Sequence, residues 1–316
     1  MADVKMIATR ESYGNTLKAL AAEGHDDLLV LDADLAAATK TGMFRKAHPD
    51  RHFDCGIAEA NMIGVACGLA SAGFKPIVHT FGPFASRRCF DQVFLSAGYA
   101  KNDITIIGTD PGVMAAMNGG THMPFEDMAL YNTIPGATII DVTDPTLLES
   151  AIRQCVNRKG VKYIRVGRKQ YAKVYAEGSE VPIGKATVLR EGGDAAVFAS
   201  GIMVHEAMKA ADILAAEGIG ISVLDMFSVK PLDEEAVVEY ARKTGAVVVA
   251  ENHNRHGGLY ASVAQVLCER CPVPAACVAV EDEFGEVGPQ GYLQERFGLT
   301  ADHVVRQVKA VLARKG

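Results

Sequence analysis

Three short segments of the chain carry side chains that could act together at one site. Residues 56–62 (GIAEANM) place Glu59 at the start of an otherwise apolar helix. Residues 79–84 (HTFGPF) end an apolar run with a histidine and two aromatic rings. Residues 118–124 (NGGTHMP) form a glycine-rich loop that contains His122. An acid, aromatic rings and a loop histidine could enclose a flat ligand, receive an anionic or hydroxylated substrate and move protons.

Each of these residues also has a structural interpretation. Glu59 could be a carboxylate favoured by the helix dipole, or an acid that its apolar neighbours keep available for proton exchange near neutrality. Phe81 and Phe84 could be ordinary core residues, and a lone histidine such as His122 is more often structural than catalytic. The residues alone leave both interpretations open.

Other polar residues follow predicted strands. Asp32 and Asp34 follow the first strand, and Arg165 and Arg168 lie at the end of another. Arginine can donate two hydrogen bonds to a phosphate, although most surface arginines bind nothing of the kind. The sequence has no G-x-G-x-x-G after a strand and no G-x-x-x-x-G-K-[ST]. These absences argue against a Rossmann dinucleotide site and a P-loop.

Short apolar strands alternate with helices along the whole chain, which indicates mostly parallel sheets covered on both faces. The predicted strands are residues 28–31, 76–81, 103–109, 137–142, 161–166, 195–199, 219–226, 246–250 and 275–280. The predicted helices are residues 11–23, 58–72, 85–100, 145–158, 204–217, 234–243 and 258–269. In such sheets ligands bind beyond the carboxyl ends of the strands, where the candidate residues lie.

The predicted fold class is therefore α/β, with two consecutive domains. Residues 171–184 lack a sustained period and contain Gly178, Pro182 and Gly184. The predicted boundaries are residues 1–175 for the first domain, 176–184 for a linker and 185–316 for the second domain. A chain of 316 residues fits two domains of ordinary size.

Composition excludes several classes of protein. A net charge of −6 gives no electrostatic footprint for nucleic acid or an anionic membrane, and no apolar run reaches the roughly 20 residues of a membrane span. The seven cysteines are scattered and odd in number, and Cys268, Cys271 and Cys277 lack a convincing fourth zinc ligand. We therefore expect a cytoplasmic protein with reduced thiols.

In order and spacing, four motifs together resemble those of the transketolases. They are GIAEANM, HTFGPF, GGTHMPFED and YIRVGR. The resemblance covers the whole chain and implies a pyrimidine-binding domain followed by a transketolase C-terminal domain. The GDG…N magnesium motif of the family's diphosphate-binding domain is missing, since the sequence contains no GDG. The chain therefore resembles the separate C-terminal half of a split transketolase.

The resemblance assigns roles to nine residues. Glu59 matches the acid that hydrogen-bonds the ring nitrogen N1′ of thiamine's aminopyrimidine and activates the cofactor, and His122 matches a histidine that contacts the ketose and relays protons. The other matched residues are Phe84, Phe81 and Asp34 at the cofactor, and Arg10, Arg168, His79 and Asn118 at the sugar substrate.

What the resemblance implies is a subunit that transfers a two-carbon ketol unit from a ketose phosphate to an aldose. The implied cofactor is thiamine diphosphate, with Mg²⁺ or Ca²⁺ held mainly by a partner subunit and no metal held by this chain. The implied assembly is a heterotetramer of two such chains with two diphosphate-binding subunits. Asn118 replaces a common aspartate and Ala38 a common serine, so the donor sugar stays open.

Three alternatives remain. The β subunit of a 2-oxo acid dehydrogenase has this size and two-domain plan, but it usually carries paired histidines where this chain has THMPFED. Deoxyxylulose-phosphate synthase shares the acid and the D-Q-V segment at residues 91–93, but it is normally one long chain. A non-catalytic paralogue would keep the fold, yet Glu59, Phe84 and His122 are all present.

Overall fold

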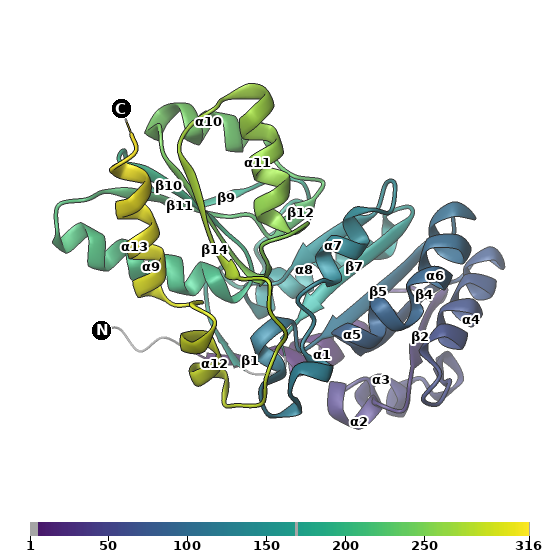
Figure 1. Cartoon of the computed structure of the whole chain (residues 1–316). Coiled ribbons are helices and arrows are strands. Elements are labelled where there is room, and N and C mark those ends of the chain that lie inside the picture. The colour runs from purple at the N-terminus through teal and green to yellow at the C-terminus, as the bar shows by residue number, and fades with distance from the viewer. Residues whose placement is uncertain (1–5, 168–169, 316) are drawn as a thin grey trace.

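The computed structural model describes residues 6–167 and 170–315, which form two α/β units, each built on its own sheet (Figure 1). Both sheets are mostly parallel and flanked by helices, as the sequence predicts. Every helix in the described ranges is too short or too polar to cross a lipid bilayer.

The first sheet has the strand order β12-β6-β7-β5-β4-β2-β3 in the described residues. All neighbours are parallel except β12, which runs antiparallel to β6. The strands are β2 (Leu28–Asp32), β3 (His52–Asp54), β4 (Lys75–Phe81), β5 (Ile104–Thr109), β6 (Thr138–Asp141), β7 (Val161–Val166) and β12 (Ser228–Lys230). A separate antiparallel pair joins β1 (Met6–Ala8) to β8 (Gln170–Ala172).

Both faces of the first sheet are buried, which explains the uninterrupted apolar runs. Leu28 and Val30 of β2 pack in one core with α1 and α8, whereas Leu29 and Leu31 pack in another with α4. Alternate residues of a strand point to opposite faces, so a strand covered on both sides must be apolar at every position. The helices of this half are α1 (Thr9–Ala22), α2 (Ala36–Thr39), α3 (Gly42–Ala47), α4 (Glu59–Ser71), α5 (Gly82–Ala85), α6 (Phe90–Gln92), α7 (Asp127–Asn132) and α8 (Pro145–Asn157).

The prediction of one continuous helix over residues 85–100 is wrong. The chain instead forms α5, a 3-10 turn η2 (Arg87–Cys89), α6 and a π-helix η3 (Val93–Tyr99). Ser86 interrupts the helix at φ −112° and ψ −94°, and its hydroxyl donates to the Gly82 carbonyl at 2.7 Å. The remaining short elements of this half are η1 (Pro49–Arg51), η4 (Gly112–Asn118) and η5 (Gly120–His122).

The second sheet has the order β14-β13-β10-β11-β9 in the described residues, with β9 antiparallel to β11. Its strands are β9 (Thr187–Arg190), β10 (Ala195–Ala199), β11 (Ile221–Asp225), β13 (Val247–Asn254) and β14 (Ala275–Val280). The helices are α9 (Ile202–Ala216), α10 (Glu234–Thr244), α11 (Leu259–Arg270), α12 (Gln290–Arg296) and α13 (Ala301–Leu312). The sequence analysis did not predict α12 or α13, or the short strands β1, β3, β8, β9 and β12.

The two halves share a strand across the predicted linker. β12 lies beyond residue 185 in the sequence, yet it pairs with β6 of the first sheet, with Ser228 opposite Ile140. The predicted boundaries at residues 175 and 185 stay a prediction, and the first sheet takes its last strand from the second half of the chain.

A buried acid makes folding stability depend on pH. Asp225 ends β11 and accepts a hydrogen bond from the Tyr175 hydroxyl at 2.8 Å. Burial raises its pKa from 3.8 to about 7, with Asp141 and Asp144 adding in the same direction. Burial likewise raises the pKa of Glu251 to about 7. Between pH 4 and pH 7 the folded chain keeps protons that the unfolded chain has lost, so stability falls as pH rises through this window.

We therefore expect Asp225→Asn to flatten that decline. Each retained proton contributes a slope of at most about 1.4 kcal/mol per pH unit, and the variant loses the share of Asp225 while Glu251 keeps its own. Urea unfolding from pH 4 to pH 8 measures the slope. The exposed Asp212→Asn serves as control, and an unchanged slope in Asp225→Asn would contradict the assignment.

Candidate functional site

The candidate site lies where the carboxyl ends of neighbouring parallel strands meet. β4 lies between β2 and β5 in the sheet. Parallel strands bring the loops that follow them to one edge. The loop with Asp34 follows β2, the turn with Phe84 follows β4, and the loop with His122 follows β5. The structure thereby gathers the candidate segments on one side of the first sheet.

Glu59 is the first residue of α4 and is 2% exposed. The preceding residue, Ala58, has no side chain that can cap the helix, so the Glu59 charge itself meets the positive end of the helix dipole. Both carboxylate oxygens accept a hydrogen bond from Nη1 of Arg88, each at 2.9 Å. The acid that the sequence singles out is therefore buried and ion-paired.

Three aromatic rings meet beside this pair. The ring centroids of Phe81 and Phe84 are 6.1 Å apart, and the His122 ring lies 5.4 Å from Phe81 and 5.1 Å from Phe84. All three contacts are edge-to-face, the arrangement that aromatic quadrupoles favour. The guanidinium carbon of Arg88 stands 3.6 Å from the Phe84 centroid. The acid and the aromatic cluster thus share Arg88 as a neighbour.

A glycine allows the turn after β4 to touch the loop after β5. A Cβ atom at Gly82 would lie 2.6 Å from Cγ of Pro124, closer than two carbon atoms can approach. Only glycine fits there without moving the loop. This contact brings Phe84 and His122 within reach of each other.

The loop that carries His122 is fixed from several sides. Oγ1 of Thr121 lies 2.9 Å from Nδ1 of His122. Arg87 donates to the Thr121 carbonyl at 3.0 Å and to the Glu126 carboxylate at 2.9 Å. Gly119 adopts φ +77°, the left-handed region that glycine tolerates best.

The second half of the chain covers the same loop. A Cβ atom at Gly120 would collide with the main chain of Gly285, and one at Gly119 would lie 2.7 Å from Val287. The segment between β14 and α12, which the sequence analysis did not single out, is therefore part of the surroundings of the site.

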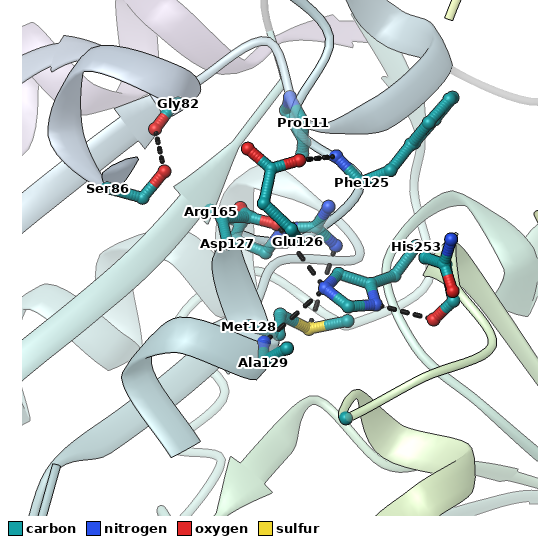
Figure 2. A network of polar contacts seen from close by, with 12 residues as sticks. Gly82, Ser86, Pro111, Phe125, Glu126, Asp127, Met128, Ala129, Arg165 and His253 are labelled. Carbon is teal, nitrogen blue, oxygen red and sulfur yellow. Dashed lines mark hydrogen bonds and ion pairs between the residues drawn. The ribbon is translucent and has the colours of Figure 1, made fainter. Parts of the chain in front are cut away.

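Figure 2 shows the polar network that holds the polypeptide following this loop. Arg165 of β7 is fully buried at its centre. Its Nε donates to Asp127 at 2.8 Å, its Nη1 lies 3.1 Å from Asp141, and its Nη2 donates to the Asn252 carbonyl at 2.9 Å. The sequence left the role of Arg165 open between a phosphate contact and none, and the structure encloses its side chain among protein partners.

His253 is a neutral member of this network. Its Nε2 accepts the amide N–H of Ala129 at 3.4 Å, and its Nδ1 lies 2.7 Å from the Asn254 carbonyl, which places the ring proton on Nδ1 (Figure 2). Burial lowers the pKa of His253 to about 4. The ring therefore binds the start of α7 and has no proton to exchange near neutrality.

Asn252 ties the second half of the chain to the start of η4. Its side-chain oxygen accepts the Val113 N–H at 3.0 Å, and its amide donates to the Pro111 carbonyl at 2.9 Å. Gly112 between them has φ +50°, and a Cβ atom there would overlap the Asn252 side chain. The segment Asp110-Pro111-Gly112, whose sequence is typical of a simple turn, therefore lies in direct contact with β13 through Asn252.

The remaining predicted residues are less closely grouped. Asp34 is exposed at φ +58°, and its N–H donates to Asp54 at 3.0 Å. Arg10 of α1 donates to the Ala38 carbonyl. Asn118 ends η4 and is half-buried. Arg168 lies outside the described residues.

His79 is fully enclosed in the sheet. It is 0% exposed, its Nδ1 lies 3.3 Å from the Tyr13 hydroxyl, and burial lowers its pKa to about 4. Its role as a substrate contact stays a prediction, and in this conformation the ring is out of reach of a ligand.

In residues 6–167 and 170–315, no three histidine, cysteine or acidic side chains are grouped so that they could hold a metal ion. The seven cysteines are free thiols.

The chain matches two protein-family models. Residues 5–173 match the transketolase pyrimidine-binding domain, and residues 184–304 match the transketolase C-terminal domain. A 6-deoxy-6-sulfo-D-fructose transketolase subunit from Clostridium sp. (strain MSTE9) is 48% identical over 306 residues, which cover 97% of this chain and 95% of that protein. Rat transketolase is 34% identical over 98% of this chain, and this chain spans 49% of the rat protein.

Solved structures show the same relationship. A split-gene transketolase described as an inactive beta4 tetramer superposes with a TM-score of 0.91 at 41% identity, covering 99% of this chain and 100% of that chain. Both matched domains thus occur together in a chain of this length. The chain belongs to the transketolase family, of which it carries the pyrimidine-binding and the C-terminal domains.

Proposed function

We propose that this chain is the subunit of a thiamine-diphosphate-dependent split transketolase that supplies the activating acid and the aromatic wall of the active site. The observation that carries the proposal is the buried carboxylate of Glu59 at the start of α4. It contacts the guanidinium of Arg88, which also lies against the Phe84 ring. The reaction is transfer of a two-carbon ketol unit from an anionic ketose to an aldose.

The residues present fit the aminopyrimidine of the cofactor. A flat ring can stack on Phe84 with Phe81 as a second wall, and the Glu59 carboxyl can share a proton with a ring nitrogen. Asp34 would contact the cofactor from the loop after β2. Bound thiamine diphosphate supplies an electron sink for the carbanion of the transferred unit. Its diphosphate and a Mg²⁺ or Ca²⁺ ion would be held mainly by the partner subunit.

This chain's other residues would handle the sugar. His122, whose ring touches both phenylalanines, would relay a proton to or from the sugar oxygens. Asn118 would hydrogen-bond a hydroxyl of the donor. Arg10 and Arg168 would hold its anionic end, because guanidinium groups bind such oxygens through two parallel hydrogen bonds.

The outer face of α4 supports the need for a partner. Gly64 and Gly68 have open space where a Cβ would be, and Val65 is 39% exposed. Beside them, Leu95 and Tyr99 of η3 are 50% and 82% exposed. Since this face begins at Glu59, we propose that the diphosphate-binding subunit covers it, in an assembly of two copies of each chain. Two relatives of this length are called a subunit and a split-gene transketolase, which agrees with this proposal.

We propose further that the anionic group of the donor is a sulfonate. The Clostridium relative is named for 6-deoxy-6-sulfo-D-fructose. Ala38 removes the hydroxyl donor of the serine common in transketolases, and Asn118 removes the charge of the common aspartate. A sulfonate carries one negative charge, whereas a phosphate monoester carries nearly two at neutral pH, so it requires fewer strong donors.

Replacing the acid tests the catalytic assignment. Glu59→Gln should lower kcat of the assembled enzyme at least about 100-fold, the usual contribution of a positioned acid or base, while assembly is unchanged. Steady-state turnover and mass photometry measure the two. Glu234→Gln, at the first position of the exposed end of α10, is the matched control and should leave kcat unchanged. Survival of turnover in Glu59→Gln would disprove the assignment.

Calorimetry tests the division of labour between subunits. Thiamine diphosphate with Mg²⁺ should bind to a mixture of this chain and its diphosphate-binding partner and give no heat with this chain alone. The reason is that the proposed anchor of the diphosphate belongs to the partner. Binding to the isolated chain at comparable affinity would show that the diphosphate site lies here.

Donor competition tests the sulfonate. We expect kcat/KM for 6-deoxy-6-sulfo-D-fructose to exceed that for fructose 6-phosphate at least about tenfold, equivalent to 1.4 kcal/mol of transition-state binding. The comparison uses one aldose acceptor and one enzyme preparation. A preference for the phosphate would overturn the choice of anion and leave ketol transfer intact.

A further inference from the structure

Arg88 makes two contacts that the proposed function reserves for the cofactor. One of its nitrogens lies 2.9 Å from both oxygens of Glu59. Its guanidinium carbon lies 3.6 Å from the centre of the Phe84 ring. The Glu59 side chain is 3% exposed and that of Arg88 is 43% exposed. A partly solvated cation therefore bridges a buried acid and an aromatic ring.

The adjacent arginine shows that this placement is specific. Arg87 has nearly the same exposure, 44%, but it turns away to Glu126 and the Thr121 carbonyl. Arg87 and Arg88 are adjacent in the 3-10 turn η2, where successive side chains project about 120° apart. A regular helix over these residues would have given both arginines other directions.

A guanidinium and an aminopyrimidine are chemically similar as ligands of this site. Both are flat, both present N–H donors in their plane, and both stack on an aromatic face. A nitrogen at equal distance from the two carboxylate oxygens lies in the plane midway between them. A ring nitrogen that shares a proton with Glu59 must approach the same carboxylate, so Arg88 and the pyrimidine compete for it.

We propose that Arg88 is a built-in substitute for the aminopyrimidine, which closes the acid site until the cofactor displaces it. The proposal rests on the proposed roles of Glu59 and Phe84. Removing one member of a buried ion pair leaves the other uncompensated, at a considerable cost in stability. Arg88 therefore neutralises Glu59 in the cofactor-free chain, and its exposure lets it leave without disturbing the core.

A closed site lowers the apparent affinity for its ligand by the fraction of molecules that are open. Removing the guanidinium should therefore strengthen cofactor binding and lower the thermal stability of the cofactor-free chain. These two effects have opposite signs. If Arg88 only supported the structure, or only held Glu59 ready for the cofactor, its removal would weaken cofactor binding and also lower the stability of the chain.

The test compares Arg88→Met with Arg242→Met, at an exposed position in the last turn of α10, each of which keeps most of the side-chain stem and removes the charge. Thiamine diphosphate with Mg²⁺ is titrated calorimetrically into the complex of each variant with the partner subunit. The Kd should fall about tenfold in Arg88→Met if the closed form holds about nine-tenths of the molecules, and should stay within twofold in Arg242→Met. Thermal unfolding of the isolated chain should show a lower Tm for Arg88→Met, and adding Glu59→Gln should restore it.

The outcomes separate this inference from the function on which it rests. If the unmodified complex binds no thiamine diphosphate, the proposed function fails. If it binds the cofactor and Arg88→Met leaves the Kd unchanged or raises it, only the closing role of Arg88 is overturned.

Discussion

The arrangement of the molecule depends on the burial of one charge, that of Arg165. A guanidinium without solvent is tolerated only when its donors are taken up and its charge is balanced. Asp127 and Asp141 supply the charge, and the Asn252 carbonyl takes another donor. These partners come from α7, the end of β6 and β13. Satisfying Arg165 therefore requires the loop after β5 and the second sheet to be in place together.

This requirement links the second half of the chain to chemistry in which it holds no proposed catalytic residue. His253 and Asn252 of β13 bind the polypeptide on either side of the His122 loop, at Ala129 and at Pro111 and Val113. The segment around Gly285 covers the loop itself. The C-terminal half thus sets the position of His122, which explains why the two domains are retained as one chain.

The periodicity of the sequence was enough to predict most of the fold. The strands at residues 161–166, 195–199 and 275–280 have the predicted bounds, because their runs of mostly apolar and β-branched residues stand out between the neighbouring helices and loops. The broken segment at residues 85–100 was not predictable in this way, since the apolar period continues through it and the interruption is a backbone property of Ser86. β12 was not predicted, because its pairing with β6 joins residues nearly ninety positions apart.

In the candidate site, too, residues that are unusual in their local sequence could be singled out, whereas residues whose role depends on distant partners could not. Glu59, Phe84 and His122 stood out locally as an acid in an apolar helix, a ring in an aromatic turn and a loop histidine, but their roles come from the resemblance to transketolases and stay a prediction. The burial of Arg165 was not predictable, because its partners are 38 and 87 residues away and nothing beside it in the sequence indicates burial. The contact of Arg88 with Glu59 was not predictable either, because the two residues are 29 positions apart in the sequence.

Arg165 and Arg88 differ in their exposure to solvent, and this difference explains their different roles. The side chains of Arg165, Asp127 and Asp141 are buried, so this group has one arrangement and stabilises the fold. The Glu59–Arg88 pair is asymmetric, with the acid enclosed and the cation half in water. Solvent stabilises the released guanidinium but cannot reach the carboxylate, so exchange of Arg88 for another donor costs far less than loss of Glu59 would. In the proposed function Glu59 meets its cofactor at a subunit interface, and pairing with the exposed Arg88 would let the chain fold before the cofactor binds.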